Sequence, residues 1–397
     1  MKDIFFNLSS KPHKLYFLGG ISSAIIYMAL ILAHYLGNAS PEVALPVHHA
    51  YAMMFVLFTQ FFTAFVFTMF PRFLSTDPVP AARYIPIFLL LNVSSIAFAV
   101  SLYLTKSGVI VAMLGGLAAY GMICKVLLEI NSKSSMLNRY DTNWVLLAFG
   151  MGGISYVLFI VSLLGAGDYH VSRFAINIGF FLYVFMVVLT LSQKMIPFFT
   201  EGKIAGYKSN KSRLFLEAVF GLLVIKVLLA SMQLAEYAFV VDLCLAVITL
   251  GEIVKWKLPF FKAEAILWVL YLSLLWIPVG FFLFFLEGLT RFLSDGAAVY
   301  FEKSPLHAIA LGYFTTIAVG FGSRIILGHA GQKPKADAFT IGLFWLIQLL
   351  VVVRVAGGLS LNVDASLFAG LIITSAALWL VLFVLWSKRY VRLLFEP

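Results

Sequence analysis

ASLFAGLIITSAALWLVLFVLWS, residues 365–387, contains no charged side chain and is long enough to cross a lipid bilayer as a single helix. A helix rises about 1.5 Å per residue, so a hydrocarbon core of about 30 Å needs roughly 20 apolar residues. Over the whole chain 62% of the residues are hydrophobic and 12% are charged, with a mean hydropathy of +0.99. Because a water-soluble monomer cannot expose such a surface, the sequence predicts a membrane protein.

Eleven further apolar stretches of similar length precede this one. Together they predict an all-α polytopic membrane protein with about twelve transmembrane helices, because the runs are uninterrupted and lack the period-two alternation of a β-barrel. No Pro/Ser-rich linker divides the chain, which predicts one integral membrane domain over residues 1–397. The predicted spans are 15–36, 48–70, 84–104, 108–128, 144–165, 171–194, 214–233, 236–255, 264–286, 304–326, 338–357 and 365–387.

Positive charge is distributed unevenly between the predicted loops. With a cytoplasmic N-terminus, most of the 28 Lys and Arg residues fall on the cytoplasmic side, as in the loop from Lys203 to Arg213. This bias predicts that both chain termini are cytoplasmic. The net charge of +10 then reflects membrane insertion, and no nucleic-acid partner is expected. The Lys and Arg residues that do not fall on the cytoplasmic side are Lys106, Arg173, Arg291, Lys303 and Arg354, which fall outside, and Lys226, which lies within a helix.

The second, sixth and tenth predicted helices end alike. Each runs from outside to inside and ends on a basic residue near a helix breaker. The pairs are Pro71 with Arg72, Lys194 with Pro197, and Arg324 with Gly328. The spacing of four helices predicts a pseudo-threefold arrangement of four-helix units. The alternative is coincidence, because the positive-inside rule places basic residues at these ends in any polytopic chain.

Three histidines lie at the ends of these helices. His49 and His307 open the second and tenth spans near the extracytoplasmic face, whereas His329 lies on the cytoplasmic side. A helix of this length separates His307 from His329 by about 33 Å, so the two cannot bind one metal ion. His49 and His307 can bind one haem from both sides if their helices are neighbours. The alternative is that histidines at a membrane interface are boundary residues.

The environment of His49 can be inferred from its helix. Met53, Gln60 and Thr63 follow it at helical spacing, and polar groups at membrane depth normally face the bundle interior. We therefore expect His49 to point inward.

Lys226 and Asp242 are the deepest charges in the sequence. Both are equally far from residue 234, the centre of the short turn between two predicted helices, so an antiparallel hairpin places them at one depth. An unpaired charge at a helix centre costs about 3 kcal/mol, which favours a buried ion pair. A proton relay is the alternative.

No motif of a common enzyme class occurs in the chain. The phosphate-binding loop G-x-x-x-x-G-K-[ST], the nucleophile elbow G-x-S-x-G and the zinc motif H-E-x-x-H are all missing. No catalytic residue is assigned, and the sequence leaves open whether the protein is an enzyme.

Four segments resemble the NnrS family. SPLHA at 304–308 and SRIILGHAGQ at 323–332 are similar to its most characteristic pattern, and KMIPFFT at 194–200 to its middle motif. HAYAM at 49–53 aligns with the family's His-Ala-His-Glu-Met. The resemblance follows nearly the whole chain in order.

The resemblance implies a multi-pass protein of the bacterial inner membrane that contains haem and copper and takes part in the response to nitric oxide. It also implies that His49, His307 and His329 are metal or haem ligands. Tyr51 and Ala52 depart from the family pattern and remove one ligand and one carboxylate from a copper site. Haem binding through His49 and His307 is less affected.

Basic side chains form a second group on the cytoplasmic side. Arg324, Lys194 and Arg72 are expected to gather there with His329. A haem propionate, another anion or a lipid headgroup fits such a cluster, and charge that only sets the topology fits it equally well.

Two other functions stay open. One is a secondary transporter, for which twelve helices and repeats are common. The other is a haem-handling assembly factor. The chain has no soluble electron-transfer domain, so electrons for any redox reaction are expected from quinol or from a protein donor. Nitric oxide is expected as a ligand, a substrate or only the inducing stress.

Overall fold

The computed structural model describes residues 7–165, 169–232, 234–294 and 299–396. Within these residues every regular element is a helix, as predicted. The elements of the first half are α2 (Pro12–Tyr35), α3 (Leu45–Tyr51), η1 (Ala52–Phe58), α4 (Thr59–Phe73), α5 (Ala81–Ser101), α6 (Lys106–Lys133), α7 (Tyr140–Leu163), α8 (Tyr169–Asn177), η2 (Ile178–Phe185) and α9 (Met186–Glu201). Those of the second half are α10 (Phe215–Ser231), η3 (Ala235–Tyr237), α11 (Ala238–Lys255), η4 (Phe260–Lys262), α12 (Ala265–Leu293), α13 (Ser304–His307), η5 (Ala308–Thr315), α14 (Thr316–His329), α15 (Ala338–Ser360) and α16 (Ala365–Leu394).

Ten helices in the described part of the chain are long and apolar enough to cross a membrane. They coincide with ten of the predicted spans, which confirms a polytopic, all-helical architecture. The predicted spans 214–233 and 236–255 are occupied by α10 and α11, which are shorter, at 17 and 18 residues. The count of twelve membrane crossings stays a prediction.

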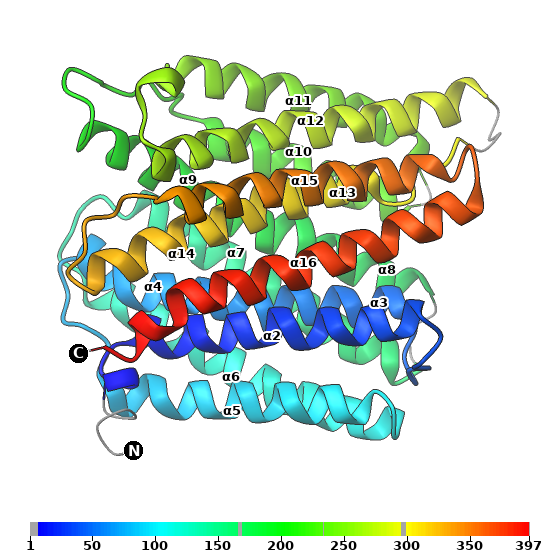
Figure 1. Ribbon diagram of the computed structural model, residues 1–397, viewed down its shortest axis with the longest axis horizontal. Coiled ribbons are helices and arrows are strands. Elements are labelled where there is room, and N and C mark those ends of the chain that lie inside the picture. The colour runs from blue at the N-terminus through cyan, green and yellow to red at the C-terminus, as the bar shows by residue number, and fades with distance from the viewer. Residues whose placement is uncertain (1–6, 166–168, 233, 295–298, 397) are drawn as a thin grey trace. The chain divides into compact units, whose positions relative to one another are not determined.

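The helices divide into two compact units. Unit 1 comprises the described residues up to Val187 together with those from Trp386 onward, and unit 2 comprises Val188–Leu385. In unit 1, α2 packs on η1 and α4, α5 lies beside α6, and α7 packs on α8 and η2 (Figure 1). In unit 2, α12 packs on α11 and also on η5 and α14, while α15 covers α13 and η5. The prediction of a single membrane domain is not tested by this division.

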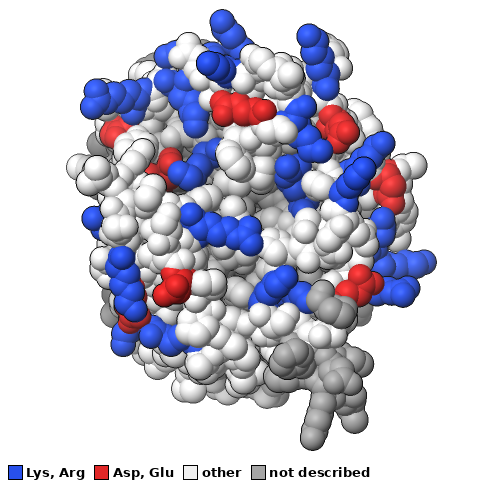
Figure 2. Space-filling view, turned by 90° about the vertical axis from the view of Figure 1, so that its left-hand side faces the viewer, with Lys and Arg blue, Asp and Glu red and all other residues white. Residues whose placement is uncertain are grey.

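The two ends of the chain meet within unit 1. The Lys14 ammonium at the start of α2 donates a hydrogen bond to the backbone carbonyl of Glu396. On the same side of the division, the Trp386 ring of α16 lies 6.1 Å from the Phe61 ring of α4. Figure 2 looks onto the helix ends that include the C-terminus, where Lys and Arg gather and Asp and Glu are fewer. The start of α2 and the residues that follow α16 therefore lie at the same end of unit 1.

Three of the long helices contain a π-helical segment, namely η1, η2 and η5. These are the second, sixth and tenth predicted spans, the same three that end on a basic residue near a breaker. In two of them a threonine hydroxyl donates to a carbonyl five residues earlier, Thr59 to Met54 at 2.8 Å and Thr315 to Ala310 at 2.9 Å. π-helical turns are rare in proteins as a whole but are common at functional sites. Their presence therefore makes these three helices candidates for a functional role.

Candidate functional site

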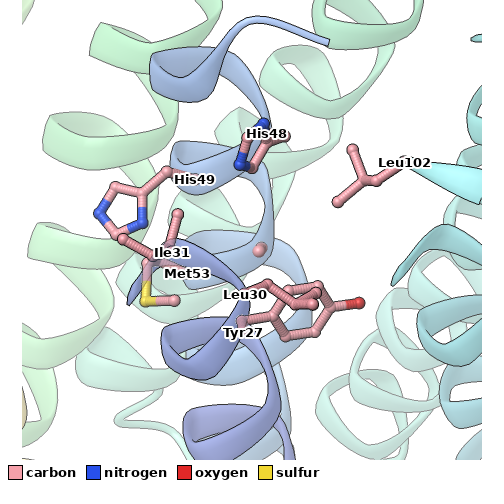
Figure 3. Close-up of a pocket in the computed structure, with 8 residues that line it drawn as sticks. Tyr27, Leu30, Ile31, His48, His49, Met53 and Leu102 are labelled. Carbon is pink, nitrogen blue, oxygen red and sulfur yellow. The ribbon is translucent and has the colours of Figure 1, made fainter. Parts of the chain in front are cut away.

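His49 lies where α3 passes into η1. Proline at the second position of α3 starts this helix, since proline needs no N–H partner in a first turn. The half-buried His49 imidazole and the Met53 thioether lie on the same side of their helix, as their spacing of four residues requires (Figure 3). Both belong to a small pocket of unit 1 whose other lining residues are Tyr27, Leu30, Ile31, His48, Ala52 and Leu102.

His48 lines the same pocket, although its sequence position had suggested no role for it. Its side chain is 3% exposed, and Nδ1 lies 2.9 Å from the carbonyl oxygen of Val43. A carbonyl oxygen can only accept, so Nδ1 carries the proton and Nε2 keeps its lone pair. This is the arrangement in which a histidine is ready to bind a metal. The His48–His49 pair was the only signal in the sequence, and it did not reveal which imidazole is buried.

Tyr51 stands where the resemblance would place a second histidine. Its hydroxyl forms a short hydrogen bond, 2.5 Å, with the Tyr156 hydroxyl inside unit 1, and its ring packs edge-on against that of Tyr156. Tyr51 is not among the residues that line the pocket, and its hydroxyl is hydrogen-bonded to Tyr156, so it does not stand in for the histidine as a ligand there. Ala52 lines the pocket but offers no carboxylate.

His307 lies in unit 2 on the short helix α13. The backbone of Lys303 before it is left-handed, with φ of 61°, and its carbonyl oxygen lies 2.9 Å from His307 Nδ1. The start of α13 is anchored on α15, because the Ser304 hydroxyl donates to the Val355 carbonyl at 2.8 Å. A Cβ on Gly358 would lie 2.1 Å from Ser304 Oγ, so this close approach requires glycine. The contact with Lys303 thus fixes the tautomer of the half-buried His307 imidazole, with the proton on Nδ1 and the lone pair on Nε2.

Arg324 and His329 lie near the other end of the same long helix. The Arg324 guanidinium stacks on the Phe199 ring of α9, with 4.0 Å between its central carbon and the ring centre. Its Nη1 is buried and has no hydrogen-bond partner among the described residues. His329 Nδ1 lies 3.0 Å from the Ile325 carbonyl oxygen, which leaves Nε2 with the lone pair. A buried guanidinium N–H suits an anionic oxygen, so this end of unit 2 can accept a carboxylate or phosphate group.

The predicted site residues are distributed over both units. His307 and His329 lie at opposite ends of the helix Ser304–His329, which confirms that they cannot bind one metal ion. Lys194 belongs to unit 2 with Arg324, whereas His49 and the exposed Arg72 belong to unit 1. The sharing of one site by His49 and His307 stays a prediction, as does the gathering of Arg72 with Arg324. Among the described residues no group of three or more His, Cys, Asp and Glu side chains could hold a metal ion.

The deep charges form the predicted ion pair. Lys226 Nζ on α10 lies 2.6 Å from Asp242 Oδ1 on α11, and the two side chains are 9% and 3% exposed. The Lys226 ammonium also lies 4.0 Å above the centre of the Phe284 ring. The α10–α11 hairpin therefore carries its two charges as a neutral, buried pair, which favours the structural role over a relay.

The comparison with known families covers almost the whole chain. The family model described as NnrS protein matches residues 7–397. No curated protein matches the sequence.

Proposed function

The chain belongs to the NnrS family, and from that premise we propose that it is a haem-binding protein of the bacterial inner membrane that acts in the response to nitric oxide. The match over residues 7–397 is the observation that carries this proposal. As part of this proposal, the chain crosses the membrane twelve times with both termini in the cytoplasm, and its helices form three four-helix units in a pseudo-threefold arrangement. The π-helices in the second, sixth and tenth helices support that arrangement.

Haem is held near the outer face by His49 and His307. His307 fits this role because the contact of its Nδ1 with the Lys303 carbonyl oxygen sets the tautomer that carries the lone pair on Nε2, the nitrogen that would bind iron. His49 fits because it lies in an otherwise mostly apolar pocket together with Met53. Bound haem iron supplies a site at which nitric oxide can coordinate.

A second anionic group binds at the cytoplasmic end of unit 2. The buried Nη1 of Arg324 supports a contact to an anion, such as a lipid headgroup or the propionate of a haem other than the one near the outer face, and His329 supplies an imidazole five residues further on. Lys194 on α9 adds positive charge to the same unit. Electrons for any redox step come from quinol or from a protein donor in the membrane.

Copper binding is a second candidate for the pocket of His49. Thioether and imidazole ligands together favour Cu(I), and the Met53 sulfur and the His49 ring lie on one side of the helix (Figure 3). Tyr51, whose hydroxyl is hydrogen-bonded to that of Tyr156, and Ala52 add no further ligand to this copper site. We therefore expect copper, if bound, to be held weakly and as Cu(I).

The first test is the visible absorption spectrum of the detergent-purified protein, oxidised, reduced, and reduced with nitric oxide, together with copper analysis. A stoichiometric Soret band that shifts with nitric oxide is the expected result. His49→Ala and His307→Ala should each lower the haem content or change the spectrum, because each removes an iron ligand. His170→Ala is the matched control, since this exposed histidine lies on the corresponding helix six and is assigned no role.

Two outcomes contradict the proposal. Unchanged haem content and spectrum in both variants would show that the ligands are wrong. No haem and no copper after expression with adequate haem would favour a secondary transporter, which solute uptake into vesicles would then test. Haem that is bound only transiently, with a partner enzyme depending on it, would identify an assembly factor.

A further inference from the structure

Four buried tyrosines meet inside unit 1, and we call them the tyrosine cluster. Tyr51, Tyr120, Tyr156 and Tyr183 come from four different helices and are at most 3% exposed. Their ring centres are separated by 5.4 Å between Tyr51 and Tyr156, 5.8 Å between Tyr156 and Tyr120, and 5.7 Å between Tyr120 and Tyr183. The four rings thus form a continuous chain of aromatic contacts, which surrounds Phe55 of η1.

The hydroxyl groups of the cluster are all hydrogen-bonded. Tyr51 and Tyr156 share a hydrogen bond between their hydroxyl oxygens. The Tyr183 hydroxyl lies 2.8 Å from that of Thr59, and the Tyr120 hydroxyl donates to the Phe149 carbonyl at 2.7 Å. The burial of each phenol oxygen is therefore compensated by a partner.

Two glycines make room for these oxygen atoms. A Cβ on Gly116 of α6 would lie 2.2 Å from the Tyr156 hydroxyl oxygen and 3.1 Å from that of Tyr51. A Cβ on Gly152 of α7 would lie 2.1 Å from the Tyr120 hydroxyl oxygen. Any larger residue at either position would displace a phenol oxygen, so the backbone is fitted to the hydroxyls and not only to the rings.

Packing alone does not account for this arrangement. Phenylalanine fills the same volume without a polar atom, and the chain uses it 39 times. Each buried hydroxyl instead costs desolvation, requires a hydrogen-bond partner and, at two positions, requires a glycine opposite. A phenol supplies two things that a phenyl ring does not, namely hydrogen bonds between helices and a hydrogen atom that a radical can remove.

We propose that the tyrosine cluster is a radical trap whose substrates are small, apolar one-electron oxidants of the nitrogen dioxide class. The proposal rests on the proposed function for the source of this oxidant, which forms where nitric oxide and oxygen dissolve together in lipid. Nitrogen dioxide removes the hydroxyl hydrogen atom of Tyr51 or Tyr156. The phenolic O–H bond breaks, an O–H bond of nitrous acid forms, the tyrosine is oxidised by one electron, and nitrogen dioxide is reduced to the nitrite level.

The Tyr51–Tyr156 hydrogen bond lets the two residues share the radical. When Tyr51 has lost its hydrogen atom, Tyr156 returns one across the hydrogen bond, so the proton and the electron move together and no external base is needed. A second nitrogen dioxide molecule can add to the ring carbon beside the oxygen. The displaced ring hydrogen then restores the hydroxyl, and the product is 3-nitrotyrosine.

The test exposes the full chain, purified in detergent, to nitrogen dioxide generated by pulse radiolysis of nitrite. Samples are frozen for electron paramagnetic resonance, and nitrated peptides are then mapped by mass spectrometry. We expect a tyrosyl radical and nitration at Tyr51 or Tyr156. The radical yield should fall in the Y51F/Y156F double variant, which keeps both rings.

Tyr16→Phe is the matched control. Tyr16 is also fully buried in unit 1, but its hydroxyl donates to the Tyr84 carbonyl and its ring contacts are with phenylalanines. The Tyr16→Phe substitution should therefore leave the radical yield unchanged. An equal radical yield in the double variant and the wild type would overturn the proposal. Nitration of the wild type only at solvent-exposed tyrosines such as Tyr169 would also overturn it. This second outcome is measured on the wild type, so it does not require any variant to fold.

The experiment separates this proposal from the haem proposal, because it needs no haem. It is run on haem-free and haem-loaded preparations of the same chain. Oxidation of the cluster in both supports the radical trap whatever the haem content proves to be. Bound haem without oxidation of the cluster overturns the trap and leaves the haem proposal intact.

Discussion

Lys226 and Asp242 show how two single residues determine the stability of one hairpin. A charge left alone in a buried site costs far more than the pair gains, because water no longer solvates it. We expect Lys226→Met to lower the free energy of unfolding by about 3 kcal/mol, because the Asp242 carboxylate would lose its ammonium partner at 2.6 Å. Thermal unfolding in detergent, followed by tryptophan fluorescence, measures the change.

The control for this prediction is the double variant K226M/D242L, in which both charges are removed. It should be closer to the wild type than either single variant is, because no charge is left unpaired. If the double variant lost as much stability as the two single variants added together, the ion pair would have no energetic role.

Gly116 offers a second prediction for a single residue. Its substitution by alanine places a methyl group 2.2 Å from the Tyr156 hydroxyl oxygen, so we expect a loss of about 1 to 3 kcal/mol of unfolding free energy. Gly121→Ala on the same helix is the control, because nothing lies within 4 Å of its Cβ position. There the lower helix propensity of glycine predicts a gain of about 0.5 to 1 kcal/mol. Similar thermal stability of the two variants would contradict the close contact.

Single residues differ in how far the sequence predicts them. The Lys226–Asp242 pair could be predicted because the two lie at equal distances from one turn, so the local geometry of a hairpin was enough. The contact between Tyr51 and Tyr156 joins residues 105 positions apart and depends on how α3 and α7 pack, which no local pattern reveals. For the same reason the sequence placed His48 at a helix start without showing that it is buried.

At the scale of an element, the π-helices raise a question about what stabilises them. The Thr315 hydroxyl donates to the carbonyl of Ala310, five residues earlier, at 2.9 Å. Thr315→Val removes this bond and should destabilise η5 by about 1 kcal/mol, which makes its amide exchange about five times faster. Hydrogen exchange followed by mass spectrometry tests this.

Thr249→Val serves as the control for that element. Thr249 is buried to the same extent, but its hydroxyl donates to Leu245, four residues earlier, within the ordinary α-helix α11. The amide exchange rate of α11 should change little, since its α-helical turns do not need a threonine hydroxyl bonded five residues back. Equal acceleration in both helices would mean that the threonine has no special role in η5.

The elements also mark the limit of the sequence pattern. Long apolar runs located the starts of the predicted spans within four residues, because the length needed to cross a bilayer is fixed by the helical rise. At their other ends α9, α12 and α16 extend seven residues beyond the predicted spans. The same runs could not predict η1, η2 and η5, because a π-helical turn changes the hydrogen-bond spacing without changing the composition. Proline at the start of α3 and α13 was a visible signal, and both helices begin there.

At the scale of the whole molecule, the number of membrane crossings depends on α10 and α11. Met232 lies in the turn between them and is 65% exposed, and Phe261 follows α11 and is fully exposed. In a variant whose free cysteines Cys124 and Cys244 are replaced by alanine, Met232→Cys should react with an impermeant maleimide on intact cells. Phe261→Cys should react only after the cells are opened, because the proposed topology places it on the cytoplasmic side.

This labelling distinguishes twelve crossings from ten. If α10 and α11 did not cross the membrane, the chain would stay on the cytoplasmic side after α9, and neither cysteine would be labelled from outside. The sequence predicted the crossing from hydropathy, but it could not predict the division into two units, which depends on long-range packing. The site predicted for His49 and His307 depends on the same long-range packing, because each residue belongs to a different unit.

The hydrogen bond from Lys14 to Glu396 has a consequence for biosynthesis. Unit 1 is built from two segments that flank unit 2 in the sequence, so all of unit 2 is translated between them. Unit 1 therefore cannot be completed until the segment from Trp386 onward has been made, and a nascent chain stalled near residue 385 would carry a finished unit 2 and an open unit 1. Quality-control proteases that recognise unpaired helices would then meet truncated chains at α2, which lacks its contact to Glu396.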